Sequence, residues 1–435
     1  MKIYNKINQK SFLIYGLGKT GISSLRFLKK QKVKKIICWD DNKSLRRKFN
    51  IKDKFIDSIK REINSVDFIV MSPGINFRKS ILYKELNINF SRLITDLDLF
   101  YIFRNPQKTI LVTGTNGKST TTALIHHLFN KNKIQSIVGG NIGIPILGLK
   151  NINNKVIIIE ASSFQLFYSK YLKPDHSIFL NFFNNHLDWH KNIQEYLESK
   201  LEIFKHQSIK QFAYIMDSKI IKKFKKRKFL PKLIKVQLSA IKKIKKKLNN
   251  AYFENQINDQ NICFVKKISE HYKISNQNFI KALNSFQGLA HRHEVIFQKK
   301  GIKVINDSKS TSAISTMKAL EGKNNIILIL GGLPKKLDKL KIQKFKQNIL
   351  NIYLIGKHTN FFKKQLIGFS KLSTTQNLKE TIKKIKIYLT QSIISKKNYT
   401  ILFSPAAASY DQFNNFEERG DYFKFLCKKY LFDYL

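Results

Sequence analysis

The chain has 435 residues, and at about 150 residues per domain this length predicts two or three domains and excludes a single small module. Its hydrophobic fraction of 43% is enough to form the cores of a globular protein. The 80 lysines and arginines exceed the 29 acidic residues by 51 charges, which points first to a nucleic acid or an anionic membrane. However, the lysines are spread through the whole chain among asparagine, isoleucine, phenylalanine and tyrosine, as AT-rich codons would produce, so we expect no nucleic-acid partner.

The cysteines and the apolar runs indicate the compartment. Cys38, Cys263 and Cys427 are far apart and have neither the spacing of a metal site nor that of a disulfide framework, which fits a reducing environment. The apolar run after the basic N-terminus is short and leads into a glycine turn, unlike a signal peptide. No stretch approaches the ~20 apolar residues of a membrane span. We therefore expect a cytoplasmic protein that does not insert into a membrane.

Three segments each open with an apolar run typical of a β-strand and continue with alternating strand and helix patterns. This alternation predicts α/β domains with parallel sheets. The opening runs lie at 12–15 and at 109–112, and the third segment starts around 288–292. We predict domains at 1–105, 106–290 and 291–435, with the lysine-rich stretch 222–250 forming peripheral elements of the middle domain.

The first glycine motif, Gly-Leu-Gly-Lys-Thr-Gly at 16–21, follows a predicted strand and precedes a helical pattern. Asp40 or Asp41 follows roughly 20 residues later, as in dinucleotide-binding turns. Taken alone the motif indicates NAD binding, but any nucleotide diphosphate would satisfy it, because the glycines only let the backbone approach a pyrophosphate at a helix N-terminus. A plain strand-to-helix turn is the alternative.

The second glycine motif, Val-Thr-Gly-Thr-Asn-Gly-Lys-Ser-Thr at 112–120, lies between a predicted strand and a predicted helix and is typical of a phosphate loop. We expect its backbone NH groups and Lys118 to surround the β- and γ-phosphates of ATP, with the Ser119 hydroxyl on Mg²⁺. Val112 stands where the usual loop has a glycine. The predicted ATP-binding residues here are Gly114, Thr115, Asn116, Gly117, Lys118, Ser119 and Thr120.

Further strings, together with this loop variant, resemble the Mur ligases of peptidoglycan synthesis. They are Ser-Pro-Gly-Ile at 72–75, Gly-Asn-Ile-Gly at 140–143, Glu-Ala-Ser-Ser-Phe-Gln-Leu at 160–166, Asn-Asp-Ser-Lys-Ser-Thr at 306–311 and Ser-Pro-Ala-Ala-Ala-Ser-Tyr-Asp-Gln-Phe at 404–413. In order and over nearly the whole chain, they are most similar to the members that add D-glutamate to UDP-N-acetylmuramoyl-L-alanine. The resemblance implies an N-terminal Rossmann-like domain that binds the UDP part of the substrate, a central P-loop ATPase-like parallel sheet, and a C-terminal Rossmann-like domain. It implies an ATP-dependent ligase that acts through an acyl phosphate in cell-wall precursor synthesis.

The middle domain is expected to bind ATP and two Mg²⁺ ions. Glu160 closes a predicted strand beside the loop, where its carboxylate can join Ser119 on Mg²⁺, although a solvated carboxylate is the alternative. His186 is a further candidate ligand, although a lone histidine is more often structural, and Asn185 stands beside it where the family usually has an acid. The resemblance implies that Lys200 is carbamylated by CO₂ and holds the second ion; without the resemblance Lys200 would be a surface helix lysine. Lys118, His186 and Lys200 are then the catalytic residues.

The remaining site residues follow from the resemblance alone. Asn261, Arg292 and Asp307 would contact ATP, although the motif Asn-Asp-Gln-Asn at 258–261 is preceded by Ile257 where relatives have a histidine. The expected contacts to the UDP substrate are Thr20, Asp40, Gly74, Asn141 and His186. The expected contacts to D-glutamate are Lys309, Thr311, Lys335, Ser404 and Phe413, with Lys336 as the alternative to Lys335. We expect the enzyme to be a monomer.

Three alternative functions are open at this point. Sister ligases add L-alanine, a diamino acid or a folate glutamate, but the strings at 163–166 and 411–413 argue against them. A basic P-loop protein that binds nucleic acid and hydrolyses ATP would need a discrete basic face. A dehydrogenase would leave the second nucleotide loop without a purpose.

Overall fold

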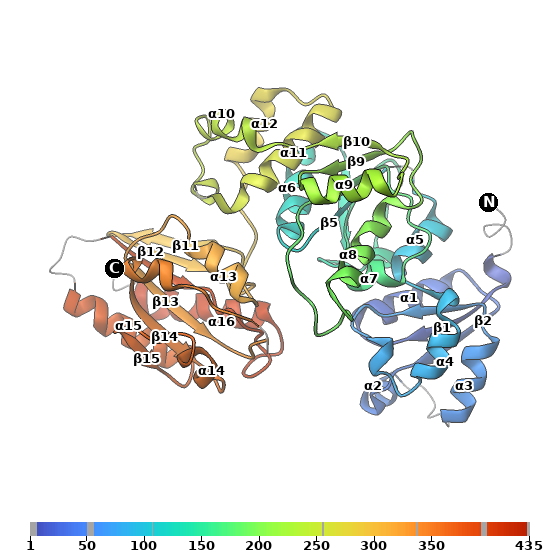
Figure 1. Ribbon diagram of the computed structural model, residues 1–435, viewed down its shortest axis with the longest axis horizontal. Coiled ribbons are helices and arrows are strands. Elements are labelled where there is room, and N and C mark those ends of the chain that lie inside the picture. The colour runs from blue at the N-terminus through green and yellow to red at the C-terminus, as the bar shows by residue number, and fades with distance from the viewer. Residues whose placement is uncertain are drawn as a thin grey trace. The chain divides into compact units, whose positions relative to one another are not determined.

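The computed structural model describes residues 7–49, 56–106, 108–254, 256–335, 338–392 and 398–432. Its strands form three sheets, one in each of the segments that the sequence predicts (Figure 1). The chain divides into two compact units, Met1–Lys242 with Gln260–Leu283, and Lys243–Asp259 with Asn284–Leu435. The first two sheets belong to the first unit and the third sheet to the second. The α/β class is thus confirmed, while the domain boundaries at 105 and 290 stay a prediction.

The first sheet has the strand order β2-β1-β3-β4, with every neighbouring pair parallel. Its central strands are continuous apolar runs because a parallel sheet is covered on both faces. The strands are β1 (Ser11–Tyr15), β2 (Lys35–Trp39), β3 (Phe68–Met71) and β4 (Leu93–Ile94), and the helices are α1 (Lys19–Lys30), α2 (Lys43–Lys48), α3 (Ile56–Ser65), α4 (Tyr83–Ile88) and α5 (Asp96–Arg104). The first glycine motif follows β1, as predicted.

The second sheet has the order β10-β9-β8-β5-β7-β6 and is also parallel throughout. Its strands are β5 (Thr109–Thr113), β6 (Ser136–Gly140), β7 (Val156–Glu160), β8 (His176–Phe179), β9 (Phe212–Ile215) and β10 (Lys232–Lys235). The helices that follow β5 are α6 (Lys118–Lys131), α7 (Ser163–Tyr168), α8 (Ile193–Leu201), α9 (Ser218–Lys226), α10 (Ile241–Lys245), α11 (Asp259–His271) and α12 (Asn276–Asn284). Val112 pairs with Glu160, so the phosphate loop and this carboxylate leave the sheet side by side.

The third sheet has the order β11-β12-β16-β13-β14-β15. Its elements are β11 (Glu294–Lys299), β12 (Ile302–Asn306), α13 (Ala313–Leu320), β13 (Ile326–Gly331), β14 (Ile349–Ile355), α14 (Thr359–Lys363), β15 (Leu372–Thr374), α15 (Leu378–Ser392), β16 (Tyr399–Phe403) and α16 (Phe416–Cys427). The edge strand β11 is antiparallel to β12, which the expectation of parallel sheets did not include. Its connection explains the difference, because Lys300 and Gly301 both have positive φ, as in a two-residue hairpin turn that cannot join parallel strands.

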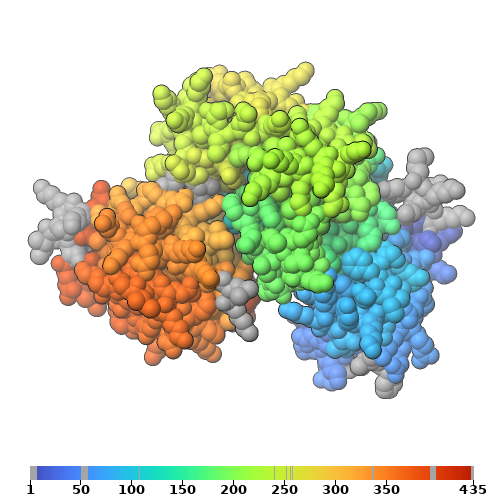
Figure 2. Space-filling model, viewed as in Figure 1, coloured from blue at the N-terminus to red at the C-terminus, as the bar shows by residue number. Residues whose placement is uncertain are grey.

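Short helical turns complete the connections. They are η1 (Ile7–Gln9), η2 (Phe77–Lys79), η3 (Phe90–Arg92), η4 (Ile146–Gly148), η5 (Glu202–Phe204), η6 (Leu238–Ala240), η7 (Ala251–Phe253), η8 (Gln256–Asn258), η9 (Gln343–Asn348) and η10 (Lys428–Phe432). In the first unit one buried apolar cluster runs from Phe12 and Leu97 beside the first sheet to Leu111 and Ile159 in the second, and the blue and green segments pack together (Figure 2). The two sheets therefore share a core.

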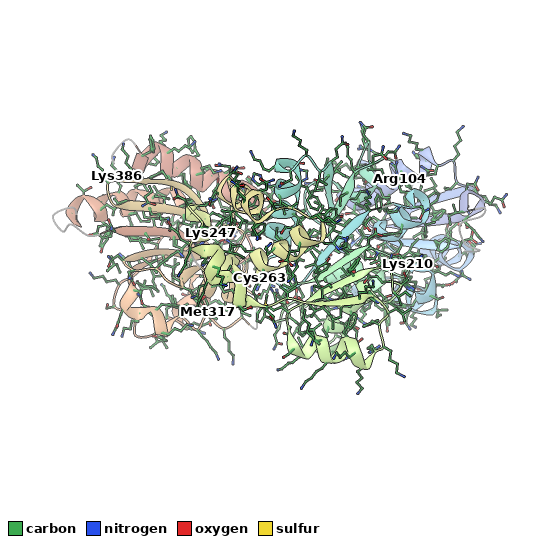
Figure 3. All side chains as sticks on the ribbon, turned by 90° about the horizontal axis from the view of Figure 1, so that it is seen from above. Arg104, Lys210, Lys247, Cys263, Met317 and Lys386 are labelled. Atoms are coloured by element: carbon green, nitrogen blue, oxygen red, sulfur yellow. The ribbon has the colours of Figure 1, made fainter. Side chains whose placement is uncertain are left out.

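Many long basic side chains extend outward from both units (Figure 3), among them the exposed Lys210 of the first unit. This dispersion matches the even spread of lysines along the sequence. At the edge strand β10 the two lysines, Lys232 and Lys235, are exposed. Within the described ranges, every helix is too short or too polar to span a lipid bilayer.

The glycine turn after β1 yields a test of the fold. A β-carbon at Gly21 would lie 1.8 Å from the carbonyl oxygen of Gly16, whereas one at Gly18 would meet nothing within 4 Å. Gly21→Ala should therefore lower the free energy of unfolding by about 2–3 kcal/mol, and Gly18→Ala, a weaker helix cap, by less than about 1 kcal/mol. Urea unfolding followed by the fluorescence of Trp39 and Trp189, both buried in this unit, measures the difference. Equal midpoints for the two variants would contradict the close approach of Gly21 to the Gly16 carbonyl.

Candidate active site

The phosphate loop joins β5 to α6 and is shaped by backbone contacts. Gly114 and Gly117 both have positive φ, and a β-carbon at Gly117 would lie 2.4 Å from the side-chain oxygen of Asn261. Asn181 fixes the loop from the next strand, because its carbonyl accepts from the NH of Thr115 and its side-chain oxygen accepts from the NH of Asn116. The loop thus has the tight turn at a helix N-terminus that suits a phosphate.

Two lysines donate to the same carbonyl of this loop. The Lys118 ammonium donates to the carbonyl oxygens of Gly114 and Thr115 at 3.0 Å each, so it curls over the loop. The Lys200 ammonium, which comes from α8, donates to the Gly114 carbonyl at 2.8 Å. Lys200, which lies 86 positions after Gly114 in the sequence, is therefore brought to the phosphate loop.

Lys200 is a buried residue and not a surface lysine. Its side chain is 1% exposed and its ammonium lies 4.8 Å from the centroid of the Tyr196 ring. Burial holds the pKa of Lys200 well below its usual value, the nearby Lys118 charge lowers it further, and Glu160 opposes the shift. Desolvation favours the neutral amine, which is the nucleophilic form of lysine.

Glu160 has one satisfied and one unsatisfied oxygen. The residue is 2% exposed, and its Oε1 accepts from the side-chain amide of Asn141 at 2.8 Å, while its backbone carbonyl accepts from the Asn141 NH. Its Oε2 is buried without a hydrogen-bond partner. Asn141, which was predicted to contact the UDP substrate, thus orients this carboxylate, and its contact to substrate stays a prediction.

His186 lies beside α7 and α8 with φ at +58°. Its ring is half-buried and packs edge-on against Phe164 and Tyr196, with centroids 4.8 and 5.9 Å away. Among the described residues, no group of three or more His, Cys, Asp and Glu side chains gathers as it would around a metal ion. A metal site here would therefore need oxygen donors from a substrate phosphate, a hydroxyl or a modified lysine.

A buried network supports the turn after Glu160. Gln165 accepts from the NH and the hydroxyl of Ser162 and donates its amide to Asp96 Oδ1 at 3.2 Å. Asp96 is 1% exposed, its Oδ2 lacks a partner, and burial raises the pKa of its carboxyl to about 6. The segment 160–166 therefore carries Glu160 and also stabilises its own turn through the hydrogen bonds between Ser162 and Gln165.

The first sheet places its predicted residues around the glycine turn. Asp40 is buried and accepts from the NH groups of Leu17 and Asn42, so it braces the turn. Asp41 accepts from the Tyr15 hydroxyl at 2.7 Å and the Trp39 indole NH at 3.0 Å. Both acids thus have partners within the domain, and the choice between them for uracil stays a prediction. Thr20 is half-buried, and Gly74 is exposed with open space where a β-carbon would stand.

The second unit has its own buried acid at the carboxyl ends of the strands. Asp307 accepts from the hydroxyls of Ser310 and Ser404 and from the NH of His293, and burial raises the pKa of its carboxyl to about 6. Ser404 is fully buried, and its hydroxyl oxygen also lies 3.1 Å from the Thr316 hydroxyl. Both side chains are used inside the domain, and their roles toward ribose and D-glutamate stay predictions.

The cations predicted for D-glutamate lie near the same strand ends. The Lys309 ammonium lies 3.7 Å from the centroid of the Phe416 ring, an aromatic contact that the sequence analysis missed. Phe413 packs partly buried against the core of the third sheet. Arg292, Thr311 and Lys335 are half-buried, and Lys336 lies outside the described residues.

Comparison with known proteins decides the family. A model of the Mur ligase middle domain matches residues 112–280, and a model of the Mur ligase MurD-like N-terminal domain matches residues 10–91. The UDP-N-acetylmuramoylalanine–D-glutamate ligase of Hydrogenobaculum sp. is 33% identical over 97% of this chain and 99% of its own length. The chain belongs to the Mur ligase family. The corresponding ligase of Oenococcus oeni is 32% identical, over 96% of this chain and 97% of its own length.

Solved Mur ligases share the fold. The UDP-N-acetylmuramate-alanine ligase MurC of Thermotoga maritima superposes with a TM-score of 0.57 at 15% identity, over 97% of this chain and 99% of its own. The MurF ligase of the same organism, in complex with ADP, superposes with a TM-score of 0.56 at 17% identity, over 86% and 92%. The family resemblance read from the sequence motifs is therefore confirmed.

His190, four residues after His186, is a buried histidine of this Mur ligase that the sequence motifs did not indicate. It is 2% exposed, its Nε2 lies 3.0 Å from the Ser163 hydroxyl, and its Nδ1 lies 3.5 Å from Glu195. Burial lowers the pKa of His190 to about 4, so the ring is neutral at pH 7. The His190 NH donates to the His186 carbonyl, so a non-helical turn brings the two residues together.

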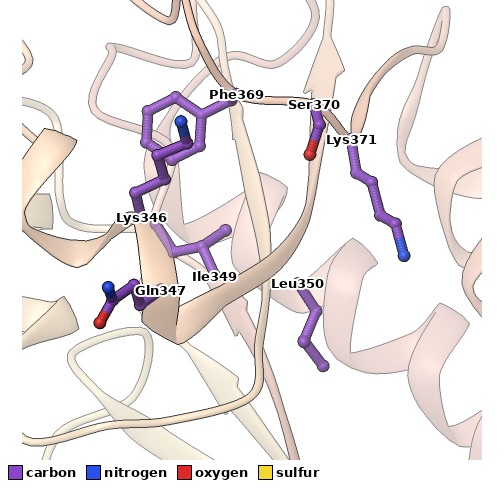
Figure 4. A pocket seen from close by; sticks show the side chains of 7 residues that line it. All are labelled: Lys346, Gln347, Ile349, Leu350, Phe369, Ser370 and Lys371. Atoms are coloured by element: carbon purple, nitrogen blue, oxygen red, sulfur yellow. The ribbon is translucent and has the colours of Figure 1, made fainter.

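A hollow of about 350 Å³ in the second unit is separate from this site. It is lined by Lys346, Gln347, Ile349, Leu350, Phe369, Ser370 and Lys371. In Figure 4 the Lys371 side chain points away from Phe369. Ile349 begins β14 and Lys371 precedes β15, so the hollow lies at the amino-terminal ends of these two strands.

Asp96 predicts how the stability of this Mur ligase depends on pH. Its pKa is about 6 when folded and about 3.9 when unfolded, so between these values the folded state binds more protons and stability falls as pH rises. From pH 4 to pH 7 the wild type should lose about 2 kcal/mol relative to Asp96→Asn. Urea unfolding at both pH values measures the loss. Asp57→Asn changes an exposed carboxyl and serves as the control, so it should lose as much stability between the two pH values as the wild type does. If Asp96→Asn also lost as much stability as the wild type, the raised pKa of Asp96 would be contradicted.

Proposed function

We propose that this Mur ligase joins D-glutamate to UDP-N-acetylmuramoyl-L-alanine at the expense of ATP. The observation that carries the proposal is the buried Lys200, held on the Gly114 carbonyl of the phosphate loop close to Lys118 and Glu160. The relatives named as D-glutamate ligases, which match nearly the whole chain, support the choice of amino acid. The enzyme acts in the cytoplasm as a monomer, two points that stay predictions.

The donor set fits Mg²⁺. Glu160 Oε2 is a buried carboxylate oxygen without a hydrogen-bond partner. Ser119, which supplies a hydroxyl, lies in the first turn of α6, the helix that follows the phosphate loop. Mg²⁺ prefers such oxygen donors, completed by phosphate and water. Ser119 and Glu160 would hold one ion, and His186 with carbamylated Lys200 would hold a second. When bound, the metal neutralises phosphate charge so that an anionic carboxylate can approach.

A carbamate on Lys200 is part of the proposal, and the electrostatics of the residue support it. An ammonium cannot ligate a cation, but a neutral amine adds to CO₂, forming an N–C bond and releasing one proton. The product is an anion with two oxygen donors. Burial of Lys200 and the charge of Lys118 both favour the neutral amine that begins this step, and the resulting anion removes the repulsion between the two lysines.

The reaction proceeds in two steps. The L-alanyl carboxylate oxygen attacks the γ-phosphorus, the bond to ADP breaks, and an acyl phosphate forms. The D-glutamate amine then attacks the acyl carbon, and the tetrahedral intermediate expels phosphate to leave the amide. Lys118 and the loop NH groups stabilise the charge on the transferring phosphoryl group, so catalysis is mostly positioning and charge neutralisation.

The other contacts are proposed from their places in the fold. Thr20 and Gly74 lie where the first sheet ends, and the open space at Gly74 suits close approach of a diphosphate. Asn261 lies against Gly117 and so borders the phosphate loop, where the proposal places the nucleotide. The predicted ATP contacts are Arg292 and Asp307, and the predicted D-glutamate contacts are Lys309, Thr311, Lys335, Ser404 and Phe413.

The choice of amino acid is tested by phosphate release from ATP with UDP-N-acetylmuramoyl-L-alanine and a panel of amino acids. D-Glutamate should react more than tenfold faster than L-glutamate, D-glutamine, L-alanine or a diamino acid, because a site built for two carboxylates is left with unpaired cations by the wrong ligand. Reactions without the UDP substrate serve as controls. Equal rates with L-alanine or a diamino acid would transfer the chain to a sister branch of the Mur ligases.

The carbamate is tested with Lys200→Ala. This variant should lose more than about 99% of the activity, comparable to the loss of a preorganised charged group, and acetate should restore part of it by supplying the missing carboxylate. Acetamide, a neutral solute of similar size, should not restore activity. Lys205→Ala, which removes an exposed lysine a few residues further on, is the matched control and should remain active. Full activity of Lys200→Ala, or equal responses to acetate and acetamide, would exclude the role.

A further inference from the structure

The loop after Gly74 contacts the segment that carries His186. Asn76 donates its side-chain amide to the Trp189 carbonyl at 2.8 Å, and the Lys79 ammonium donates to the Asp188 carbonyl at 3.0 Å. From α7, the Tyr168 hydroxyl donates to the Ile75 carbonyl and accepts from the NH of the following Phe77. Figure 1 shows α7 and α8 beside the first sheet. The loop that presents the proposed substrate contact thus holds the catalytic segment of the second sheet.

Arg78 makes the strongest of these contacts. Its two terminal nitrogens donate to the two carboxylate oxygens of Glu195, at 3.1 and 2.5 Å. The guanidinium carbon also lies 4.8 and 5.3 Å from the centroids of the Phe77 and Phe167 rings. A bidentate, ring-flanked guanidinium has one orientation, so this pair fixes geometry better than an ordinary surface ion pair would.

Glu195 lies in the first turn of α8, the helix that carries Lys200. Its Oε1 also accepts from the NH of Lys191, and its own NH donates to the capping side chain of Asn192. Lys200 is five residues further on, about 7.5 Å along the axis and roughly 140° around it. The helix is therefore held at two separated points, by Arg78 at its start and by the Gly114 carbonyl at Lys200.

The same carboxylate is linked to the turn that carries Glu160. His190 Nδ1 lies 3.5 Å from Glu195 Oε1, and its Nε2 lies 3.0 Å from the hydroxyl of Ser163. Ser163 begins α7, three residues after Glu160. His190 thus lies between Glu195, which it approaches without a hydrogen bond, and this turn, to which it is hydrogen-bonded.

We propose that Arg78 is a positioning residue of the ligase reaction. By gripping Glu195 it sets the placement of α8, so that Lys200 reaches the phosphate loop, and it ties that placement to the loop that receives the UDP substrate. The inference rests on the proposed function, since Lys200 matters to the reaction only there. According to this inference, turnover depends on the Arg78–Glu195 contact, which joins the first sheet's loop to a helix of the second sheet.

The test compares Arg78→Met and Arg78→Lys with Arg227→Met. Methionine keeps an apolar stem between the Phe77 and Phe167 rings but removes the ion pair, while lysine restores one charged donor. Arg227 pairs with Glu198 of the same helix at 2.7 Å but on an exposed surface, so Arg227→Met is the matched control. Tryptophan fluorescence during thermal unfolding shows that each variant is folded.

Three measurements are made on each variant. They are kcat and KM for the UDP substrate and D-glutamate, hydrogen exchange of the amides at 196–201, and the ¹³C carbamate signal after equilibration with labelled bicarbonate. Arg78→Met should lower kcat roughly ten- to hundredfold, as expected when a catalytic group is misplaced, while KM for D-glutamate is unchanged. The amide hydrogens of residues 196–201 should also exchange faster in Arg78→Met than in the wild type. This variant should need a higher bicarbonate concentration to reach the same ¹³C carbamate signal. Arg78→Lys should recover part of each effect, and Arg227→Met should match the wild type.

The outcomes separate this inference from the proposed function. A kcat for Arg78→Met within twofold of the wild type, or losses equal to those of Arg227→Met, would overturn the positioning role. Loss of thermal stability with unchanged kcat and unchanged exchange at 196–201 would also overturn it, because a merely structural residue behaves in that way. If the wild type makes no product with D-glutamate, the proposed function fails, while hydrogen exchange still reads whether Arg78 holds α8.

Discussion

Two lysine side chains that converge on one backbone carbonyl organise the candidate active site. The Gly114 oxygen accepts from the half-buried Lys118 and from Lys200, which is almost completely buried. A second positive charge beside Lys118 is unfavourable in this setting, and burial together with the Lys118 charge lowers the pKa of Lys200. The arrangement is therefore incomplete without negative charge, which Glu160 supplies in part and which phosphate and a carbamate supply in the proposed reaction. The loop, the buried helix lysine and the orphaned carboxylate oxygen all make sense around this one contact.

The rest of the first unit serves to hold that contact. Parallel strands send the phosphate loop and Glu160 out of the same sheet edge, since Val112 and Glu160 are paired neighbours. Lys200 arrives from another helix, and its placement depends on how α8 docks. The shared apolar core fixes the two sheets coarsely, and the polar contacts of the loop after Gly74 fix them more finely. Chemistry in the second sheet is thereby tied to the sheet proposed to hold the substrate.

What could be predicted from the sequence was the part encoded locally. The glycine turn and the phosphate loop each need a few adjacent residues of special conformation, so their strings were readable and their strand-to-helix settings are confirmed. The role of Lys200 was inferred only from a family resemblance, because its burial comes from a hydrogen bond to a residue 86 positions away. The pair Arg78–Glu195, 117 positions apart, had no local signal at all. The hairpin at Lys300 and Gly301 did have one, a glycine between two apolar runs, and it was overlooked.

Part of the excess positive charge lies on the edge strands of the three sheets. A parallel sheet that does not close into a barrel leaves a row of unpaired NH and carbonyl groups on each outer strand, ready to pair with another chain. Lys232 and Lys235 stand exposed on β10, Lys35 on β2 and Lys299 on β11. A second strand approaching any of these edges would have to bury an ammonium. The exposed lysines on these outer strands therefore disfavour pairing of one molecule with another edge to edge.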